Sequence, residues 1–151
     1  MKKLKAYLAS PYGFSEGTRY FMAKVYVPAL KGVVEIINPW DLISENEVKE
    51  AEKKGKESKF AMEIGKRNKD AIDSADIVIA ALDGQEVDSG TSVEVGYAVG
   101  KGKKVYGYRT DFRQTGEKGA TVNLQVQYFI ESSGGRIVSN LNDLKKAIKV
   151  G

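Results

Sequence analysis

Two carboxylates, Asp88 and Glu94, follow a buried strand in the segment ADIVIAALDGQEVDSGTSVEVGYAVGKGK. The apolar run 75–82 is typical of a parallel strand covered on both faces, and Asp88 and Ser89 are residue types that begin helices. Open α/β sheets bind ligands at the carboxyl ends of their strands. A carboxylate pair at this edge can supply a nucleophile and a proton donor to a ligand.

Glu94 is expected one to two turns into the helix that Asp88 begins. The positive end of a helix favours an ionised carboxylate, which predicts that Glu94 is an anion suited to act as a nucleophile. Each residue also has an ordinary structural interpretation. Asp88 fits a helix cap, in competition with Ser89, and Glu94 fits an exposed helix residue.

Polar residues follow the other predicted strands as well, and such strand ends converge on one crevice in a doubly wound sheet. They pair as Tyr7 with Ser10, Asn38 with Asp41, Asp83 with Asp88, and Arg109 with Asp111. Asp70, near the end of the preceding helix, is expected to face the same crevice from another side. Asp70 beside Lys69 also fits a surface charge, and Tyr7 inside a strand also fits plain packing.

The chain contains neither histidine nor cysteine. Their absence removes Ser-His-Asp and Cys-His catalysis, disulfides and nearly every zinc site. Any chemistry must therefore rest on carboxylates, Lys, Tyr, Ser or Thr, and we expect no metal and no cofactor. Since no disulfide marks an oxidising compartment, a cytoplasmic location is the default prediction.

The net charge of +4 comes mostly from Lys interleaved with Glu, as in VKEAEKKGKESKF. Such interleaving is typical of solvated helix faces rather than of a stripe that binds nucleic acid. No apolar run is long enough to span a membrane, and the N-terminal apolar piece is too short for a signal-peptide core. We therefore expect neither nucleic acid nor a membrane as a partner.

The 151 residues are expected to form a single domain, residues 1–151, in which strands and helices alternate. Strands are predicted at 3–9, 33–37, 75–82, 104–108 and 136–138, and helices at 16–30, 60–73, 89–100, 123–131 and 139–149. This order predicts an α/β fold with a doubly wound five-stranded parallel sheet, a flavodoxin-like or Rossmann-like three-layer sandwich. Pro28 is expected to kink or shorten the first helix. Residues 40–59, where charges dominate, are expected to form a mobile, partly helical excursion that covers a site.

The motifs YLASP, NKD, DSGTSVEVGYA, TDFR and VNLQ occur along the chain in that order. Together they resemble the nucleoside 2-deoxyribosyltransferase family, from residue 7 to about residue 130, and DSGTSVEVGYA is the most specific part. The resemblance implies transfer of 2-deoxyribose between nucleobases in nucleoside salvage. It also implies deoxynucleosides and nucleobases as small-molecule partners, and a homo-oligomer.

Matched by motif, five residues acquire roles from this resemblance. Glu94 is the nucleophile that attacks the anomeric carbon and forms a covalent deoxyribosyl ester. Asp70 and Asp88 bind the departing base and handle its proton, and Tyr7 orients the nucleophile. Asn123 is lent by a neighbouring subunit to the sugar 5'-hydroxyl, which implies at least a dimer. Two displacements through carboxylates return the original anomer and require neither His nor Cys.

Further substrate contacts are expected in the first loop, in the excursion and around the specific motif. These residues are Ser10, Tyr12, Phe14, Asp41, Asp83 and Gly90. Tyr12 and Phe14 are residue types that stack on a base or sugar, although aromatics in such a loop also fit packing. Trp40, Asp41 and the excursion after them are expected to contribute to the base pocket.

Two alternatives stay open. The loop ASPYGFSEGT fits a cradle for a 5'-phosphate, as in the related 2'-deoxynucleoside 5'-phosphate N-hydrolases, or simply a helix cap formed by Ser15. The C-terminal aromatic of characterised transferases has no counterpart in NDLKKAIKVG, so the contacts to the 5' end are not fixed. A non-catalytic nucleotide-binding module is less favoured, because it gives no reason to collect several carboxylates beside Tyr7.

Overall fold

Five parallel strands form the central sheet of the structure, a computed structural model that describes residues 3–151. The strands are β1 (Lys5–Ala9), β2 (Glu35–Ile37), β3 (Ile77–Ala81), β4 (Lys104–Tyr108) and β5 (Ile137–Val138). Their order, β2-β1-β3-β4-β5, is the flavodoxin-like order and confirms the predicted doubly wound sheet. The winding reverses between β1 and β3, so the ligand crevice is expected at the carboxyl ends of these two strands.

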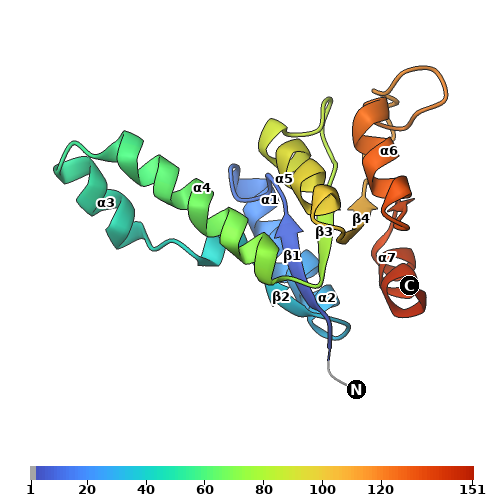
Figure 1. Ribbon diagram of the computed structural model, residues 1–151, viewed down its shortest axis with the longest axis horizontal. Helices are drawn as coiled ribbons and strands as arrows, with labels where there is room; N and C mark the ends of the chain where they lie inside the picture. The colour runs from blue at the N-terminus through green and yellow to red at the C-terminus, as the bar shows by residue number, and fades with distance from the viewer. Residues whose placement is uncertain (1–2) are drawn as a thin grey trace.

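Helices cover both faces of this sheet (Figure 1). They are α1 (Glu16–Phe21), α2 (Val27–Lys31), α3 (Glu45–Lys53), α4 (Glu57–Ser74), α5 (Ser89–Gly100), α6 (Leu124–Ser132) and α7 (Leu141–Val150), with a π-helical turn η1 (Met22–Tyr26) and a 3-10 turn η2 (Pro39–Asp41). The cluster on one face packs residues of η1, α2 and α7 against the sheet, and the cluster on the other packs α4, α5 and α6. Within residues 3–151, no helix has the length and apolar character needed to cross a membrane.

Alternate residues of β1 enter opposite clusters because strand side chains alternate between the faces. Ala6 and Leu8 pack on the α1 side, whereas Tyr7 and Ala9 pack on the α5 side. Tyr7 is fully buried there. The helix that follows β3 therefore lies over the face on which the Tyr7 side chain projects.

The first helical stretch differs from its prediction. Pro28 does not shorten it, because α1, η1 and α2 run without interruption from Glu16 to Lys31. Proline lacks an N–H and its ring crowds the carbonyl four residues earlier, so the wider π-helical turn immediately before Pro28 accommodates it. Strand β2 is also shorter than predicted, because Val33 and Val34 donate their N–H groups to the Leu30 carbonyl in the turn that closes α2.

The predicted excursion is mostly helical and extends away from the sheet as the pair α3 and α4 (Figure 1). A capping box at Ser44 and Glu47 begins α3. Arg67 of α4 holds this end in place, since its Nη1 donates to Glu47 Oε1 at 2.9 Å and to the Leu42 carbonyl at 3.1 Å. The mobility of this segment stays a prediction.

Candidate active site

Tyr7 and Glu94, which lie 87 positions apart in the chain, meet at the carboxyl end of β1. The Tyr7 hydroxyl donates to Glu94 Oε1 at 2.6 Å. Burial raises the pKa of Tyr7 above its ordinary value, so the hydroxyl remains a donor. The predicted contact between the two residues is therefore present in the folded chain.

The surroundings of Glu94 oppose the ionised form that the helix N-terminus was predicted to favour. Burial raises the pKa of Glu94 from 4.5 to about 7, the Tyr7 hydrogen bond lowers it in part, and the charge of Asp88 raises it further. The helix N-terminus has little effect because Glu94 lies beyond the first turn of α5, where the dipole is effective. The ionisation of Glu94 therefore falls in the neutral pH range.

Asp88 caps α5, as one of its two interpretations required. Its Oδ2 accepts the N–H of Thr91 at 2.9 Å and the Thr91 hydroxyl at 3.2 Å. The residue also lines a cavity together with Glu94. Asp88 therefore both caps α5 and lies where a ligand in the cavity can contact it.

The cavity above Glu94 has a volume of about 430 Å³. It is lined by Ser10, Phe14, Pro39, Trp40, Ile43, Ser44, Glu45, Val48, Ile64, Asn68, Asp88, Gly90, Thr91 and Glu94. Apolar walls come from the first loop, η2, α3 and α4, whereas the carboxylates of α5 lie at the sheet. The excursion thus covers the site, as predicted, and supplies the apolar surface.

Trp40 forms a wall that is fixed to the first loop. Its Nε1 donates to the Ser10 carbonyl at 3.1 Å, and Phe14 packs edge-on against the indole with a centroid distance of 4.7 Å. A Cβ on Gly13 would lie 2.1–2.4 Å from the indole ring. Only glycine at position 13 lets the indole pack this closely on the loop.

Asp70 does not face the crevice. The side chain is 48% exposed on α4, where it pairs with Lys66 and Lys69, and the Lys66 hydrogen bond is the main reason that its pKa is lowered. Asn68, two residues earlier, lines the cavity instead. Two helical residues correspond to more than half a turn, so Asp70 and Asn68 lie on different sides of α4.

Asn68 was missed by sequence reasoning although a signal was present. It continues the four-residue spacing of Phe60, Ile64 and Ile72, and is therefore a polar residue on the apolar stripe of α4. Its Oδ1 is buried without a hydrogen-bond partner in the ligand-free chain. A buried, unpaired amide beside a cavity is suited to a polar ligand.

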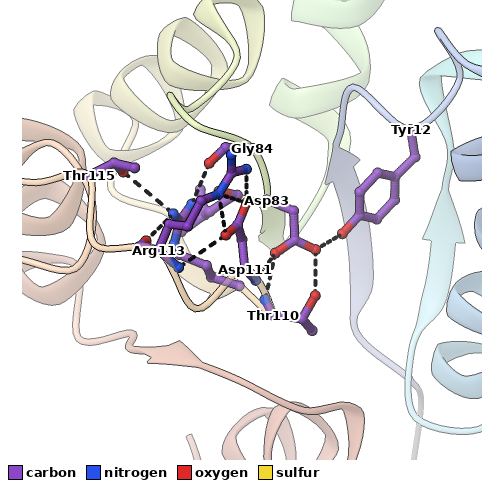
Figure 2. A network of polar contacts seen from close by, with 9 residues as sticks. Tyr12, Asp83, Gly84, Thr110, Asp111, Arg113 and Thr115 are labelled. Atoms are coloured by element: carbon purple, nitrogen blue, oxygen red, sulfur yellow. Dashed lines mark hydrogen bonds and ion pairs between the residues drawn. The ribbon is translucent and has the colours of Figure 1, made fainter.

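Asp83 and Tyr12 bind each other rather than lining the cavity (Figure 2). The Tyr12 hydroxyl donates to Asp83 Oδ2 at 2.7 Å, and Tyr12 is only 3% exposed. Neither residue lines this cavity, and Tyr12 packs as its structural interpretation requires. Asp41 is exposed in η2 and also lies outside the cavity, which η2 lines with Pro39 and Trp40.

The remaining predicted contacts divide between the cavity and more distant positions. Ser10, Phe14 and Gly90 line the cavity. Asn123 caps α6, where its Oδ1 accepts the Gln125 N–H at 3.0 Å, and it borders a separate hollow between α5 and α6. Ser15 caps α1, as the structural interpretation of the first loop requires. Across residues 3–151, no three Asp or Glu side chains converge to hold a metal ion.

Residues 6–137 match the family described as nucleoside 2-deoxyribosyltransferase. No protein of curated function matches the chain in sequence.

Three solved structures share the fold. A conserved protein from Enterococcus faecalis V583 has a TM-score of 0.70 and 22% identity over 98% of each chain. A 2-deoxyribosyltransferase from Bacillus psychrosaccharolyticus has a TM-score of 0.69 and 21% identity over 93% of this chain and 90% of its own. A CMP N-glycosidase from Clostridium botulinum has a TM-score of 0.56 and 18% identity over 97% of this chain and 98% of its own. These likenesses describe the fold, and the match over residues 6–137 shows that the chain belongs to the nucleoside 2-deoxyribosyltransferase family.

Proposed function

We propose that this chain transfers 2-deoxyribose between nucleobases, with Glu94 as the nucleophile. The observation that carries the proposal is the 2.6 Å hydrogen bond from Tyr7 to Glu94 at a cavity that Asp88 also lines. A half-buried carboxyl with a raised pKa and an orienting donor is typical of an active site. Membership of the family supports the same reaction class.

In the first displacement, one Glu94 oxygen attacks C1' of a 2'-deoxynucleoside. The C1'–N bond breaks, its electron pair leaves with the base, and a glutamyl ester of deoxyribose forms. Tyr7 donates to one carboxylate oxygen and thereby directs the other toward the sugar. The reacting form has Glu94 ionised and the proton of the Glu94–Asp88 pair on Asp88, which lies on the same cavity and gives that proton to the departing base.

In the second displacement, a ring nitrogen of another base attacks C1' and the ester bond to Glu94 breaks. The carboxylate is regenerated, and Asp88 accepts the proton that the incoming base loses. Inversion occurs twice, so the product keeps the original anomer. Hydrolysis would require water to take the place of the second base, and the apolar walls formed by Trp40, Val48 and Ile64 favour a planar base instead.

Asn68 takes the base-binding role that the sequence had assigned to Asp70. Its amide offers a donor and an acceptor side by side, which matches the paired polar atoms on the edge of a base. An amide does not titrate, so the proton transfers depend on Asp88. The unpaired Oδ1 of Asn68 gains a partner when a base binds.

The charges around the cavity favour a nucleoside over a nucleoside 5'-phosphate. Three carboxylates, those of Glu45, Asp88 and Glu94, line it, and among residues 3–151 no Lys or Arg does. A phosphate placed inside would therefore lack a cationic partner and face like charges. Asn123 of a second copy completes the sugar site in the proposed homo-oligomer.

The reaction is tested by chromatography of purified protein with 2'-deoxyadenosine, with and without a second free base, and with 2'-deoxyadenosine 5'-monophosphate. We expect a new deoxynucleoside only when the second base is present, and little release from the monophosphate. Glu94→Gln should lower transfer by about a thousandfold or more, whereas the exposed Glu131→Gln should not change it. Base release from the monophosphate alone would contradict the transferase and favour the N-hydrolase.

The covalent step has its own test. Mass spectrometry of the protein quenched during turnover should show one deoxyribosyl group on the peptide that contains Glu94. A protein that transfers deoxyribose without forming this adduct would exclude Glu94 as the covalent carrier.

A further inference from the structure

Asp83 links the loops on either side of the end of β3 (Figure 2). Its Oδ2 accepts the hydroxyls of Tyr12 at 2.7 Å and Thr110 at 2.9 Å. Its Oδ1 accepts the backbone N–H of Thr110 at 2.5 Å and of Asp111 at 2.8 Å. Because each oxygen already accepts two hydrogen bonds, the carboxylate serves the protein rather than a ligand.

The side of this link that involves β4 is held twice. Besides the bonds to Asp83, the buried Arg109 directs its Nη1 to the carbonyls of Leu82 and Gly84. The loop after β4 therefore donates hydrogen bonds both to the Asp83 side chain and to the backbone carbonyls on either side of it. Asp83 is consequently a fixed point at the end of the sheet.

The other side of the link is a single hydrogen bond, the one from Tyr12. The Tyr12 ring packs edge-on against Phe21 and Tyr26, with centroid distances of 5.6 and 5.5 Å. Burial raises the pKa of Tyr12 above its ordinary value, so its hydroxyl donates throughout the useful pH range. Tyr12 lies between Ser10 and Phe14 in the chain, and both of these line the substrate cavity.

We propose that Asp83 is a positioning residue for substrate binding, acting through the Tyr12 hydroxyl on the first loop. The loop is held so that Ser10 and Phe14 meet Trp40 as a preformed wall for the base. Preformed walls spare a ligand the cost of ordering them, so this link contributes to affinity and leaves the chemistry of Glu94 unaffected. The identity of the bound substrate, but not the positioning itself, rests on the proposed function.

Two variants each remove one hydroxyl donor from the same oxygen, Asp83 Oδ2. Tyr12→Phe keeps the packed ring and breaks the link to the first loop. Thr110→Val is the matched control, because it removes the 2.9 Å bond on the β4 side and keeps the Tyr12 link. Both are expected to fold, and thermal melting measures the stability that each one loses.

The first readout needs no substrate. Trp40 is the only tryptophan of the chain and is bonded to the first loop, so its fluorescence reports the position of that loop. Acrylamide should quench Trp40 more strongly in Tyr12→Phe than in the wild type or in Thr110→Val. Equal quenching in all three proteins would overturn the positioning role, whether or not the protein is a transferase.

The second readout is steady-state transfer. Tyr12→Phe should raise the KM for 2'-deoxyadenosine about tenfold with kcat nearly unchanged, while Thr110→Val should alter neither. A general loss of stability would lower the active fraction and therefore the apparent kcat, and would leave KM in place. An equal rise in KM in both variants, or a loss confined to kcat in Tyr12→Phe, would overturn the proposal.

Discussion

Replacing Tyr7 with Phe removes one hydroxyl and should displace the pH profile of deoxyribosyl transfer. The hydroxyl donates to Glu94 Oε1 at 2.6 Å and lowers the pKa of Glu94 against the opposing effect of burial. A hydrogen bond to a charged group contributes about 1.5–3 kcal/mol, which corresponds to about one to two pKa units. From about 7 in the wild type, the pKa of Glu94 should therefore rise to about 8–9 in Tyr7→Phe.

This displacement makes the loss of activity depend on pH. At pH 7 the ionised fraction of Glu94 falls from about one half to about 1–10%, which lowers kcat/KM about five- to fiftyfold. At pH 9.5 both proteins have mostly ionised Glu94, so their rates should differ by less than about fourfold. The assay is chromatographic initial rates of transfer between pH 5.5 and 9.5.

Tyr97→Phe is the matched control. Tyr97, on the same helix as Glu94, donates its hydroxyl to Asp73 Oδ1 at 2.8 Å, outside the cavity. This variant should keep the wild-type profile with its acid midpoint near pH 7. A Tyr7→Phe variant that loses the same factor at every pH would refute the argument, because Tyr7 would then act on something other than the ionisation of Glu94.

Three further predictions follow from the same geometry. The pKa of Glu94 is raised in the folded chain, so the contribution of Glu94 to stability is fully present below pH 4.5 and is lost as the pH rises through 7. The free energy of unfolding of Glu94→Gln, measured in urea, should therefore equal that of the wild type at pH 4.5 and exceed it by about 3 kcal/mol at pH 8.5. Asn68→Ala should raise the KM for the deoxynucleoside about tenfold in steady-state assays. Asp70→Asn alters only exposed ion pairing and should leave KM and kcat within about twofold of the wild-type values. Gly13→Ala forces a Cβ to within 2.1–2.4 Å of Trp40 and should cost about 1–3 kcal/mol of stability by chemical unfolding, with a shifted Trp40 emission maximum.

Topology predicts that Tyr7 and Glu94 lie near the same crevice, and the family resemblance implied the contact between them. Two adjacent parallel strands end at one edge, and a helix that leaves one strand covers the neighbouring strand on the same face. The strand around Tyr7 and the helix that begins after Asp88 could both be predicted from the residues of each segment alone, and both are present in the structure. The sequence shows no burial, however, and burial is what sets the pKa of Glu94.

The network around Asp83 was hidden for a different reason. Its donors come from Tyr12, Thr110 and Asp111, which lie 71, 27 and 28 positions away, and two of the four donors are backbone N–H groups that any residue type provides. A carboxylate at a strand end looks the same in sequence whether it binds a ligand or holds a loop. Only the positions of the donors distinguish the two.

The apolar wall of the cavity is the part of the candidate site that the sequence predicts least, and the reason is the geometry of the excursion. The α3–α4 pair extends away from the sheet (Figure 1), so most of its surface is solvated and charged. Only a few side chains of each helix line the cavity. On α4 these inward positions are Ile64 and Asn68. An error of two positions along α4 replaces a residue that lines the cavity with one that faces solvent, as happened for Asp70. The phase of a helix must therefore be fixed from its complete apolar stripe before any polar residue on it is assigned to a ligand.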